Sequence, residues 1–430
     1  MSVLVYLLNI LLLAGLVWWL YRQPWVKELQ PYFFPALVLK LLCGVLLGLL
    51  YFQYYGGAGD TVTYYKASLR LTAYAKNDFG NYVWLLLFNE FESEAFRATI
   101  PFSRLPDFSN SFYLIKLLSV LNLFTNGAYY LNTLYFSLFS FWGAGRLSAA
   151  LATAFPSTKE AAVVAFLFFP SVVFWSAGLT KDAIMFGSMC WLVAFAVNRA
   201  HSKPVRVEEV LLLPLMLYLF VRIKIFYAAL LLPLLLGYLV IMGLSKFVVA
   251  LKQRTVQVAV FITAFTILVL VATQLRDFLS IEFIVEQVFF SYEDLLQRSL
   301  HGPHMVLSLK PTLASMVAHY PEALINAVFR PFMGESWEWL YIIMGLENLL
   351  LFILMALSLA SLFRKAPVKV ELLYVALLLF IFVLGGIIGL STPNFGSLSR
   401  YRVVFLPFLV YLLLQNYYTQ KLLNRLQRLP

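Results

Sequence analysis

Long runs of apolar residues constrain this chain more than any other feature of its sequence. A helix needs about 20 mostly apolar residues to cross the hydrocarbon core of a bilayer, and eleven runs approach or reach that length. A shorter run over 112–124 is a candidate twelfth segment, interfacial or re-entrant. We therefore expect an all-α polytopic membrane protein with about 11 (10–12) transmembrane helices, forming a single transmembrane domain over 1–430. The runs lie near 3–20, 34–52, 127–145, 160–177, 183–198, 208–221, 225–243, 255–274, 340–362, 372–390 and 403–418.

The composition agrees with this class. Hydrophobic residues make up 62% of the chain and charged residues only 12%, a balance typical of membrane proteins. The net charge of +11 is distributed over short segments between the apolar runs, so we expect no nucleic-acid partner. Cys43 and Cys190 both lie in apolar runs and lack the spacing of metal ligands, so no metal site is predicted.

Lysine and arginine indicate the orientation, because cytoplasmic segments carry an excess of both. Six short segments that alternate along the chain hold 16 basic residues and five acidic ones. The long segments 53–111 and 275–338 carry 14 acidic and nine basic residues. We therefore place the N-terminus outside and the C-terminus in the cytoplasm. The six segments are 21–33, 146–160, 199–209, 244–254, 363–371 and 419–430.

Two long outer loops follow from this topology, and both are expected to be partly helical. In the first, 53–126, the stretch 81–97 has the pattern of an amphipathic helix in the membrane interface. In the second, 275–339, the stretch 311–330 is expected to form a helix pair bent at Pro321.

The first outer loop opens with the most suggestive polar stretch of the chain, YYGGAGDTVTYYKASLR. Glycines precede Asp60, which is followed by Thr61, Tyr64 and Tyr65. An acid on a glycine turn at a membrane surface is a candidate catalytic base, and the tyrosines are candidate substrate-binding residues. The structural alternative is that Asp60 caps a helix starting at Thr61.

Three further polar segments lie on the same predicted side. Phe169–Asp182 ends in Lys181 and Asp182, and the structural alternative for Asp182 is that it stabilises the N-terminus of a helix. Phe329–Glu335 places Arg330 and Glu335 in a Pro/Gly turn, which an ion pair would also explain. Pro393–Arg402 is a Gly/Ser loop that ends in arginines suited to a phosphate or carboxylate. The candidate binding residues are Tyr64, Tyr65, Lys181, Asp182, Arg222, Arg330, Glu335, Arg400 and Arg402.

Cations at the outer ends of membrane helices require an explanation, because they oppose the positive-inside trend. One reason is pairing with Asp182, Glu335, Glu338 or Glu347; the other is an anionic ligand that arrives from the outer face. The residues concerned are Lys116, Lys181, Arg222, Lys224, Arg400 and Arg402. Lys40 lies inside the second apolar run, and we expect it to snorkel toward the cytoplasmic side.

Together these segments suit transfer from a lipid-linked phosphate donor. Cations would stabilise a departing phosphate or pyrophosphate, and Asp60 would deprotonate an acceptor hydroxyl.

The chain also resembles the GT-C superfamily of polyprenyl-phosphate-dependent membrane glycosyltransferases, including bacterial relatives grouped with protein mannosyltransferases. The resemblance rests on GGAGDTVTYY, PSVVFWSAGLTKDA and FGSLSRYRVVFLP. It implies a GT-C-like fold in the bacterial cytoplasmic membrane and a catalytic acid in the first external loop, matching Asp60. It also implies a polyprenyl-phosphate partner and a saccharide, lipid or protein acceptor, with a divalent cation as a candidate cofactor.

The chain departs from the family pattern in two respects, and other functions stay open. Asp60 follows the second apolar run rather than the first, and it does not belong to an acidic pair. A polysaccharide polymerase or ligase acting on a lipid pyrophosphate has the same general features. A flippase or transporter for lipid-linked substrates is a second alternative, and a non-catalytic envelope scaffold is a third.

The predicted topology can be tested by cysteine labelling. Cysteines placed at positions 75, 300 and 396 should react with an impermeant thiol reagent in whole cells, with any outer membrane permeabilised first. Cysteines at 202, 250 and 366 should not react, because the charge count places them in the cytoplasm. The reversed labelling pattern would contradict an outer-face site.

Overall fold

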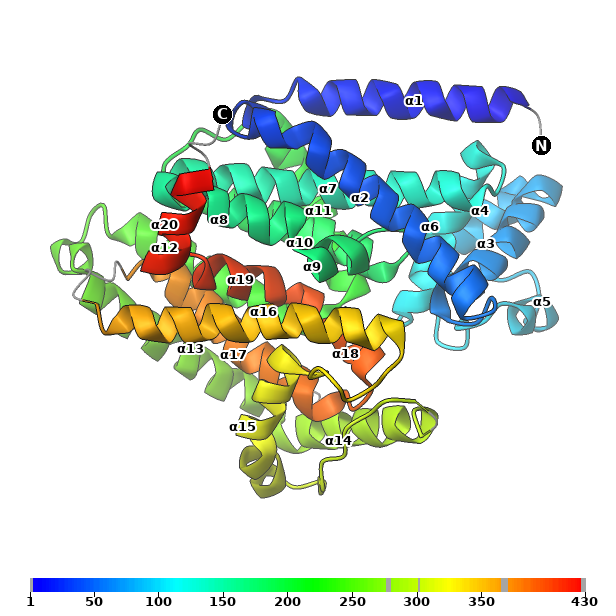
Figure 1. The fold of residues 1–430 in the computed structure, drawn as a ribbon. Coiled ribbons are helices and arrows are strands. Elements are labelled where there is room, and N and C mark those ends of the chain that lie inside the picture. Colours follow the sequence, from blue (N-terminus) through cyan, green and yellow to red (C-terminus); the bar gives the residue numbers. More distant parts are fainter. Residues whose placement is uncertain (1–2, 276–279, 301, 365–369, 427–430) are drawn as a thin grey trace. The chain divides into compact units, whose positions relative to one another are not determined.

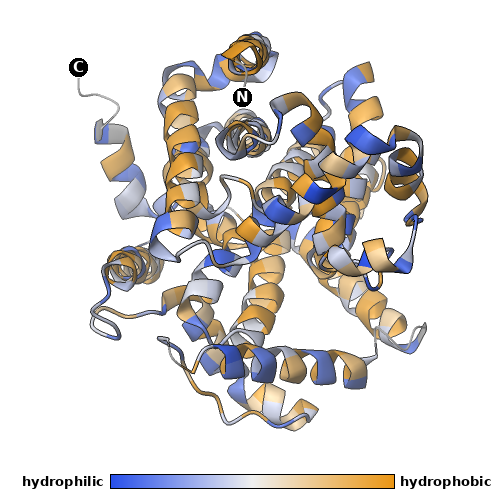
Figure 2. Ribbon diagram, turned by 90° about the vertical axis from the view of Figure 1, so that its right-hand side faces the viewer, coloured by the Kyte–Doolittle hydropathy of each residue, from blue (hydrophilic) through white to orange (hydrophobic). Residues whose placement is uncertain are grey.

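The computed structural model describes residues 3–275, 280–300, 302–364 and 370–426 (Figure 1). The chain is 81% helical, and the described residues contain no strand, only an isolated bridge between His304 and Asn394. Most of the longer helices are predominantly hydrophobic (Figure 2). This confirms the prediction of an all-helical protein and is consistent with a polytopic membrane protein.

Among the described residues, seven helices are long and apolar enough to cross a membrane, and they coincide with seven of the eleven predicted runs. A bent pair, Phe395–Val404 with Leu406–Leu413, becomes an eighth span if it is counted as one, with a bend of 69°. The count of about eleven is not confirmed. The seven are Val3–Tyr21, Pro24–Tyr54, Lys181–Ala200, Ile225–Leu244, Arg254–Gln274, Trp339–Leu362 and Leu372–Ser391.

The remaining predicted runs are helical but differ from a simple span. The run 160–177 comprises α8 (Lys159–Val163), a π-helical turn over Val164–Phe168 and α9 (Pro170–Trp175). The helix is interrupted at Phe169, whose backbone is extended, because the residue before a proline disfavours the helical conformation. The run 208–221 becomes a helix of 17 residues, about 25 Å long and so shorter than the roughly 30 Å hydrocarbon core. The run 127–145 corresponds to a helix of 26 residues, Tyr129–Ala154, which continues past the predicted end of the run.

The chain divides into two compact units, each described here by itself. The first comprises 1–153, 173–195 and 205–228, and the second comprises 154–172, 196–204 and 229–430. The α-helices are α1 Val3–Tyr21, α2 Gln30–Leu49, α3 Asp60–Asn77, α4 Phe79–Phe88, α5 Glu94–Thr99, α6 Asn110–Thr125, α7 Tyr129–Ala154, α8 Lys159–Val163, α9 Pro170–Trp175, α10 Lys181–Ala200, α11 Val207–Ile223, α12 Ile225–Leu244, α13 Arg254–Leu275, α14 Ile281–Arg298, α15 Leu313–Phe329, α16 Trp339–Leu362, α17 Leu372–Ser391, α18 Phe395–Tyr401, α19 Leu406–Leu413 and α20 Tyr417–Leu426.

Small residues let helices approach closely in both units, as is common between membrane helices. In the first unit, a Cβ on Gly143 of α7 would lie 2.0 Å from the carbonyl oxygen of Gly187 on α10. In the second unit, a Cβ on Gly389 of α17 would lie 1.9 Å from the carbonyl oxygen of Ala323 on α15. These separations are too short for any side chain, so the glycines set the two helix crossings.

The prediction of one amphipathic helix over 81–97 is wrong. Helix α4 ends at Phe88 because Asn89 adopts a left-handed conformation with φ of 59°, and α5 begins only after Ser93 caps it. The two pieces still belong to the first predicted outer loop. Ala75 of α3 is buried, so the exposed neighbour Lys76 suits the labelling experiment better.

The prediction of a bent helix pair over 311–330 is also wrong, because α15 is one helix with Pro321 in its interior. A proline removes one backbone hydrogen bond but leaves the rest of the helix intact. Thr312 caps the helix through the amide of Ser315, and the contact with Gly386 and Gly389 of α17 supports the segment on both sides of Pro321.

Candidate functional site

A glycine turn places Asp60 at the start of α3. Gly56, Gly57 and Gly59 have φ values of 59°, 79° and 106°, a region that residues with a Cβ rarely adopt. Asp60 is exposed and lies in the first helical turn, whereas Gly59 is the N-cap residue and offers no side-chain cap. The helix therefore begins at Asp60 rather than at Thr61, where the helix dipole favours a carboxylate.

Thr61 connects the start of α3 to the turn before α10. Its hydroxyl donates to the backbone carbonyl of Leu179, which is 118 positions away in the sequence. Thr180 caps α10, because its hydroxyl accepts from the amide of Ala183 at 3.1 Å. Asp182 lies in the first turn of the same helix, where the helix dipole favours a carboxylate, as the structural alternative expected. The contact between Thr61 and Leu179 also means that two of the four predicted polar segments meet.

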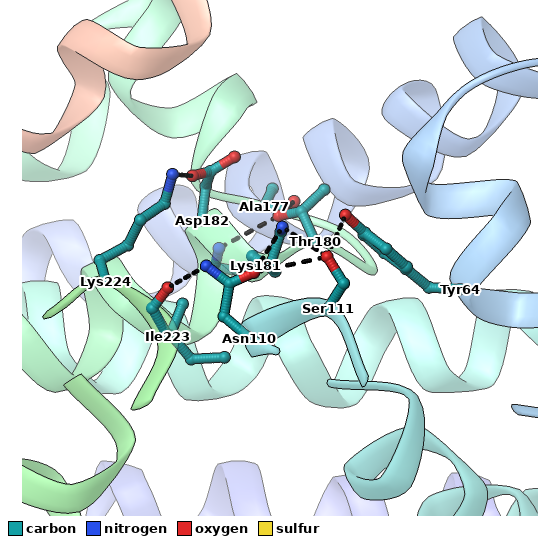
Figure 3. Close-up of polar contacts among 10 residues, drawn as sticks. Tyr64, Asn110, Ser111, Ala177, Thr180, Lys181, Asp182, Ile223 and Lys224 are labelled. Carbon is teal, nitrogen blue, oxygen red and sulfur yellow. Dashed lines mark hydrogen bonds and ion pairs between the residues drawn. The ribbon is translucent and has the colours of Figure 1, made fainter. Parts of the chain in front are cut away.

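Lys181 occupies the centre of this region (Figure 3). Its Nζ donates to Asn110 Oδ1 at 3.2 Å and to Ser111 Oγ at 3.1 Å. The ammonium also lies 5.2 Å from the centre of the Tyr64 ring, and the Tyr64 hydroxyl is 3.3 Å from Ser111 Oγ. These contacts, two hydrogen bonds and the face of an aromatic ring, fix the position of the ammonium group at the start of α10.

Asp182 and Lys224 lie on the other side of Asn110 (Figure 3). Asp182 is only 3% exposed, and its Oδ1 lies 4.0 Å from Lys224 Nζ. The Asn110 amide donates to the carbonyl of Ile223 at 3.1 Å and so fixes the link that carries Lys224. We call Tyr64, Asn110, Ser111, Lys181, Asp182 and Lys224 the polar cluster.

Two predicted binding residues of the first unit lie outside these hydrogen bonds. Tyr65 donates to the carbonyl of Gly127 at 2.6 Å, and its ring packs edge-on against Tyr129. Arg222 donates to the carbonyl of Asp107 and lies 5.4 Å from the ring of Tyr113.

The other four predicted residues belong to the second unit. Arg330 Nε lies 3.3 Å from Glu335 Oε1, and Glu335 Oε2 accepts from the amide of Phe332 at 2.7 Å, so this pair closes the turn. Arg330 also lies 5.9 Å from the ring of Phe395, which brings the third and fourth predicted segments together. Arg400 is half-buried and 5.2 Å from the ring of Tyr401.

Arg402 is completely buried and bound on several sides. It donates to Asn348 Oδ1 at 2.6 Å, to the Val328 carbonyl at 3.2 Å and to Glu347 Oε1 at 3.2 Å. Glu347 Oε2 in turn accepts from the amide of Ser171 at 2.7 Å. These contacts fit the pairing alternative for Arg402, whose role as a ligand-binding residue stays a prediction.

The prediction that Lys40 snorkels is wrong. Lys40 is 4% exposed, and its Nζ donates to Ser176 Oγ at 2.5 Å and to the Val173 carbonyl at 3.3 Å. Carbonyl groups at a helix C-terminus carry partial negative charge, so the end of α9 offers the ammonium a nearer partner than the membrane surface.

Sequence reasoning missed Asn110 and Ser111. They precede the apolar run 112–124 and resemble ordinary helix-start residues, so only their three-dimensional contacts distinguish them. In the part of the chain that the structure describes, no three His, Cys, Asp or Glu side chains are grouped to hold a metal ion. Comparison with protein-family models, curated proteins and solved structures found no match.

The buried Arg402–Glu347 pair yields a stability prediction. Arg402→Met and Glu347→Gln should each lower the free energy of unfolding by about 3–5 kcal/mol, because each leaves a buried polar partner unpaired. The double variant should lose much less than the sum of the two, as measured by denaturant or thermal unfolding in detergent. Asp294 and Arg298 form an exposed pair on α14, and Arg298→Met should leave the unfolding midpoint unchanged. Additive losses at positions 347 and 402 would contradict the pairing.

Proposed function

We propose that the protein is a membrane glycosyltransferase that transfers a sugar from a polyprenyl-phosphate-linked donor to an acceptor on the outer face of the cytoplasmic membrane. The observation that supports this most is the contact between Thr61 and Leu179. It holds the start of α3, with Asp60 exposed on it, against the turn that presents Lys181. An acid and a cation from distant parts of the sequence are thereby available to one reaction.

In the proposed reaction, the acceptor hydroxyl oxygen attacks the anomeric carbon of the donor sugar. The bond between that carbon and the phosphate oxygen breaks, and its electron pair leaves with the phosphate. Asp60 takes the proton of the acceptor hydroxyl as general base. The proton, the sugar and the leaving phosphate are thus all accounted for without a redox step or a further reactant.

The polar cluster would serve the leaving group. Lys181 is held by the side chains of Asn110 and Ser111, so its ammonium group would already be in position to contact a departing phosphate. Such preorganised cations stabilise charge that develops in the transition state. Lys224 is 4.0 Å from Asp182, a loose pair that could exchange for a phosphate contact as the donor binds.

The proposal also includes the fold and the topology expected from the sequence. These are a GT-C-like fold of about eleven spans in the bacterial inner membrane, an outer N-terminus and a cytoplasmic C-terminus. The acceptor is a saccharide, lipid or protein, and a divalent cation is a candidate cofactor. A polymerase or ligase using a lipid pyrophosphate would employ the same cluster and is distinguished by its donor.

A specific observation favours a second candidate, a flippase for lipid-linked substrates. Ionisable residues inside membrane spans often mark substrate pathways, and Lys40 is buried within the span Pro24–Tyr54. Under this alternative, Lys40→Met should abolish translocation of a lipid-linked sugar in proteoliposomes. The same variant should leave sugar transfer measurable under the glycosyltransferase proposal.

Asp60→Asn tests the proposed function. The substitution preserves the shape of the side chain and removes the base, so transfer should fall by about 10²- to 10⁴-fold. The measurement is the release of polyprenyl phosphate from a panel of polyprenyl-phosphate sugars in detergent or proteoliposomes. Because Asp60 is exposed and asparagine keeps the size of its side chain, the melting temperature should change little.

Glu94→Gln is the matched control for this experiment. Glu94 is also exposed in the first turn of a helix of the same loop, and its neutralisation should leave transfer within about twofold, since it does not lie at the start of α3, which Thr61 holds against the turn before α10. Full activity in Asp60→Asn, or an equal loss in Glu94→Gln, would contradict the role of Asp60 as base.

A further inference from the structure

A separate cavity of about 430 Å³ lies within the first unit, between α4, α6 and α11. Its polar wall consists of Asn89, Asp107, Tyr113, Lys116, Tyr218 and Arg222, and leucines and a valine complete it. None of the six residues of the polar cluster lines this cavity. It is therefore distinct from the site used in the proposed reaction.

Two cations are held in place at the cavity wall. Lys116 is 8% exposed, and its Nζ donates to Asn89 Oδ1 at 2.6 Å and to the Leu86 carbonyl at 2.9 Å. Arg222 is held by the carbonyl of Asp107 and by the face of the Tyr113 ring. Neither cation has a carboxylate among these contacts, so an anionic group in the cavity can approach both of them.

The cavity carries a net positive charge. Asp107 is the acidic residue of its lining, and one of its carboxylate oxygens accepts from the Asn89 amide. One carboxylate against an ammonium and a guanidinium leaves one positive charge in excess. A single anionic group would neutralise that excess.

Two of the helices that line the cavity, α4 and α11, carry exposed apolar side chains. On α4, Trp84, Leu87 and Phe88 are 53%, 68% and 55% exposed, as expected of an interfacial helix whose aromatic residues lie at headgroup depth. On α11, Leu211 and Tyr218 are 73% and 51% exposed. A ligand with its anionic group in the cavity would thus have apolar surface beside it for a hydrocarbon chain.

We propose that this cavity binds the anionic headgroup of a membrane lipid, with a phosphate group held between Arg222 and Lys116 and the acyl chains lying along α4 and α11. The guanidinium offers paired donors to phosphate oxygens, and the ammonium adds a point charge. The site is independent of Asp60 and does not require the proposed glycosyl transfer.

Lys116 gives the site a pH dependence. Burial, with a smaller effect of the Arg222 guanidinium, lowers the pKa of Lys116 to about 8 against the opposing effect of Asp107. The other titratable groups in the cavity wall are Tyr113, whose pKa burial raises to about 12, and Tyr218. The ammonium is charged below its pKa, so affinity for a phosphodiester is greatest below about pH 8 and falls as Lys116 deprotonates above it.

The test is lipid binding to the purified full-length protein in a neutral detergent, measured by native mass spectrometry. Phosphatidylglycerol should bind at one saturable site, whereas phosphatidylcholine should bind at least about tenfold more weakly, since its headgroup has no net charge. Arg222→Gln and Lys116→Gln should each weaken phosphatidylglycerol binding by about tenfold or more. Lys66→Gln removes one charge from an exposed position on α3 and should leave binding unchanged.

A second measurement needs no substitution. In the wild-type protein, phosphatidylglycerol affinity should fall as the pH rises through about 8, and Lys116→Gln should abolish that dependence. Equal binding of the two lipids would overturn the proposal, as would unchanged affinity in Arg222→Gln. Competition by millimolar inorganic phosphate with no requirement for a lipid chain would also overturn it, because the ligand would then be a soluble anion. Loss of Asp60-dependent transfer has no bearing on any of these outcomes.

Discussion

Buried charge in an apolar chain has to be satisfied within the protein, and this requirement organises both units. Arg146 pairs with Glu209, Lys40 bonds to Ser176 and a carbonyl, and Arg402 pairs with Glu347. A charge left without a partner in a low-dielectric interior would cost several kcal/mol. Each of these contacts joins segments far apart in the sequence, so satisfying the charges also fixes which helices meet.

The same requirement separates structural polar residues from candidate functional ones. Arg402 has a carboxylate, an amide and a carbonyl as partners and is completely buried, an arrangement that fits a structural ion pair. Lys181 lies beside Asn110, Ser111 and the Tyr64 ring at the start of α10, and Lys116 and Arg222 face a cavity. Residues of the second kind support proposals about ligands, whereas those of the first kind support the fold.

Hydrophobic length was enough to predict the seven long apolar helices, because spanning a bilayer imposes a strong and local pattern. The exact ends of helices, and whether a proline interrupts one, were not predictable from hydrophobic length. Asn89 ends α4 through a left-handed conformation, and Pro321 stays inside a helix that packs closely on α17. The glycine turn was enough to single out Asp60 as a candidate site residue. Asn110 and Ser111 could not be singled out from the sequence, because the contact that distinguishes them is with Lys181, about 70 positions away.

The central claim is that Asp60 and Lys181 act on one lipid-linked donor at the start of α3 and α10. The most direct measurement is a cryo-electron microscopy structure with a non-transferable phosphonate analogue of a polyprenyl-phosphate sugar. The account predicts that the phosphonate contacts Lys181 Nζ and that the sugar lies on the side of Asp60, within hydrogen-bond reach of the incoming hydroxyl. An analogue bound away from both residues, or no binding at saturating concentration, would contradict it.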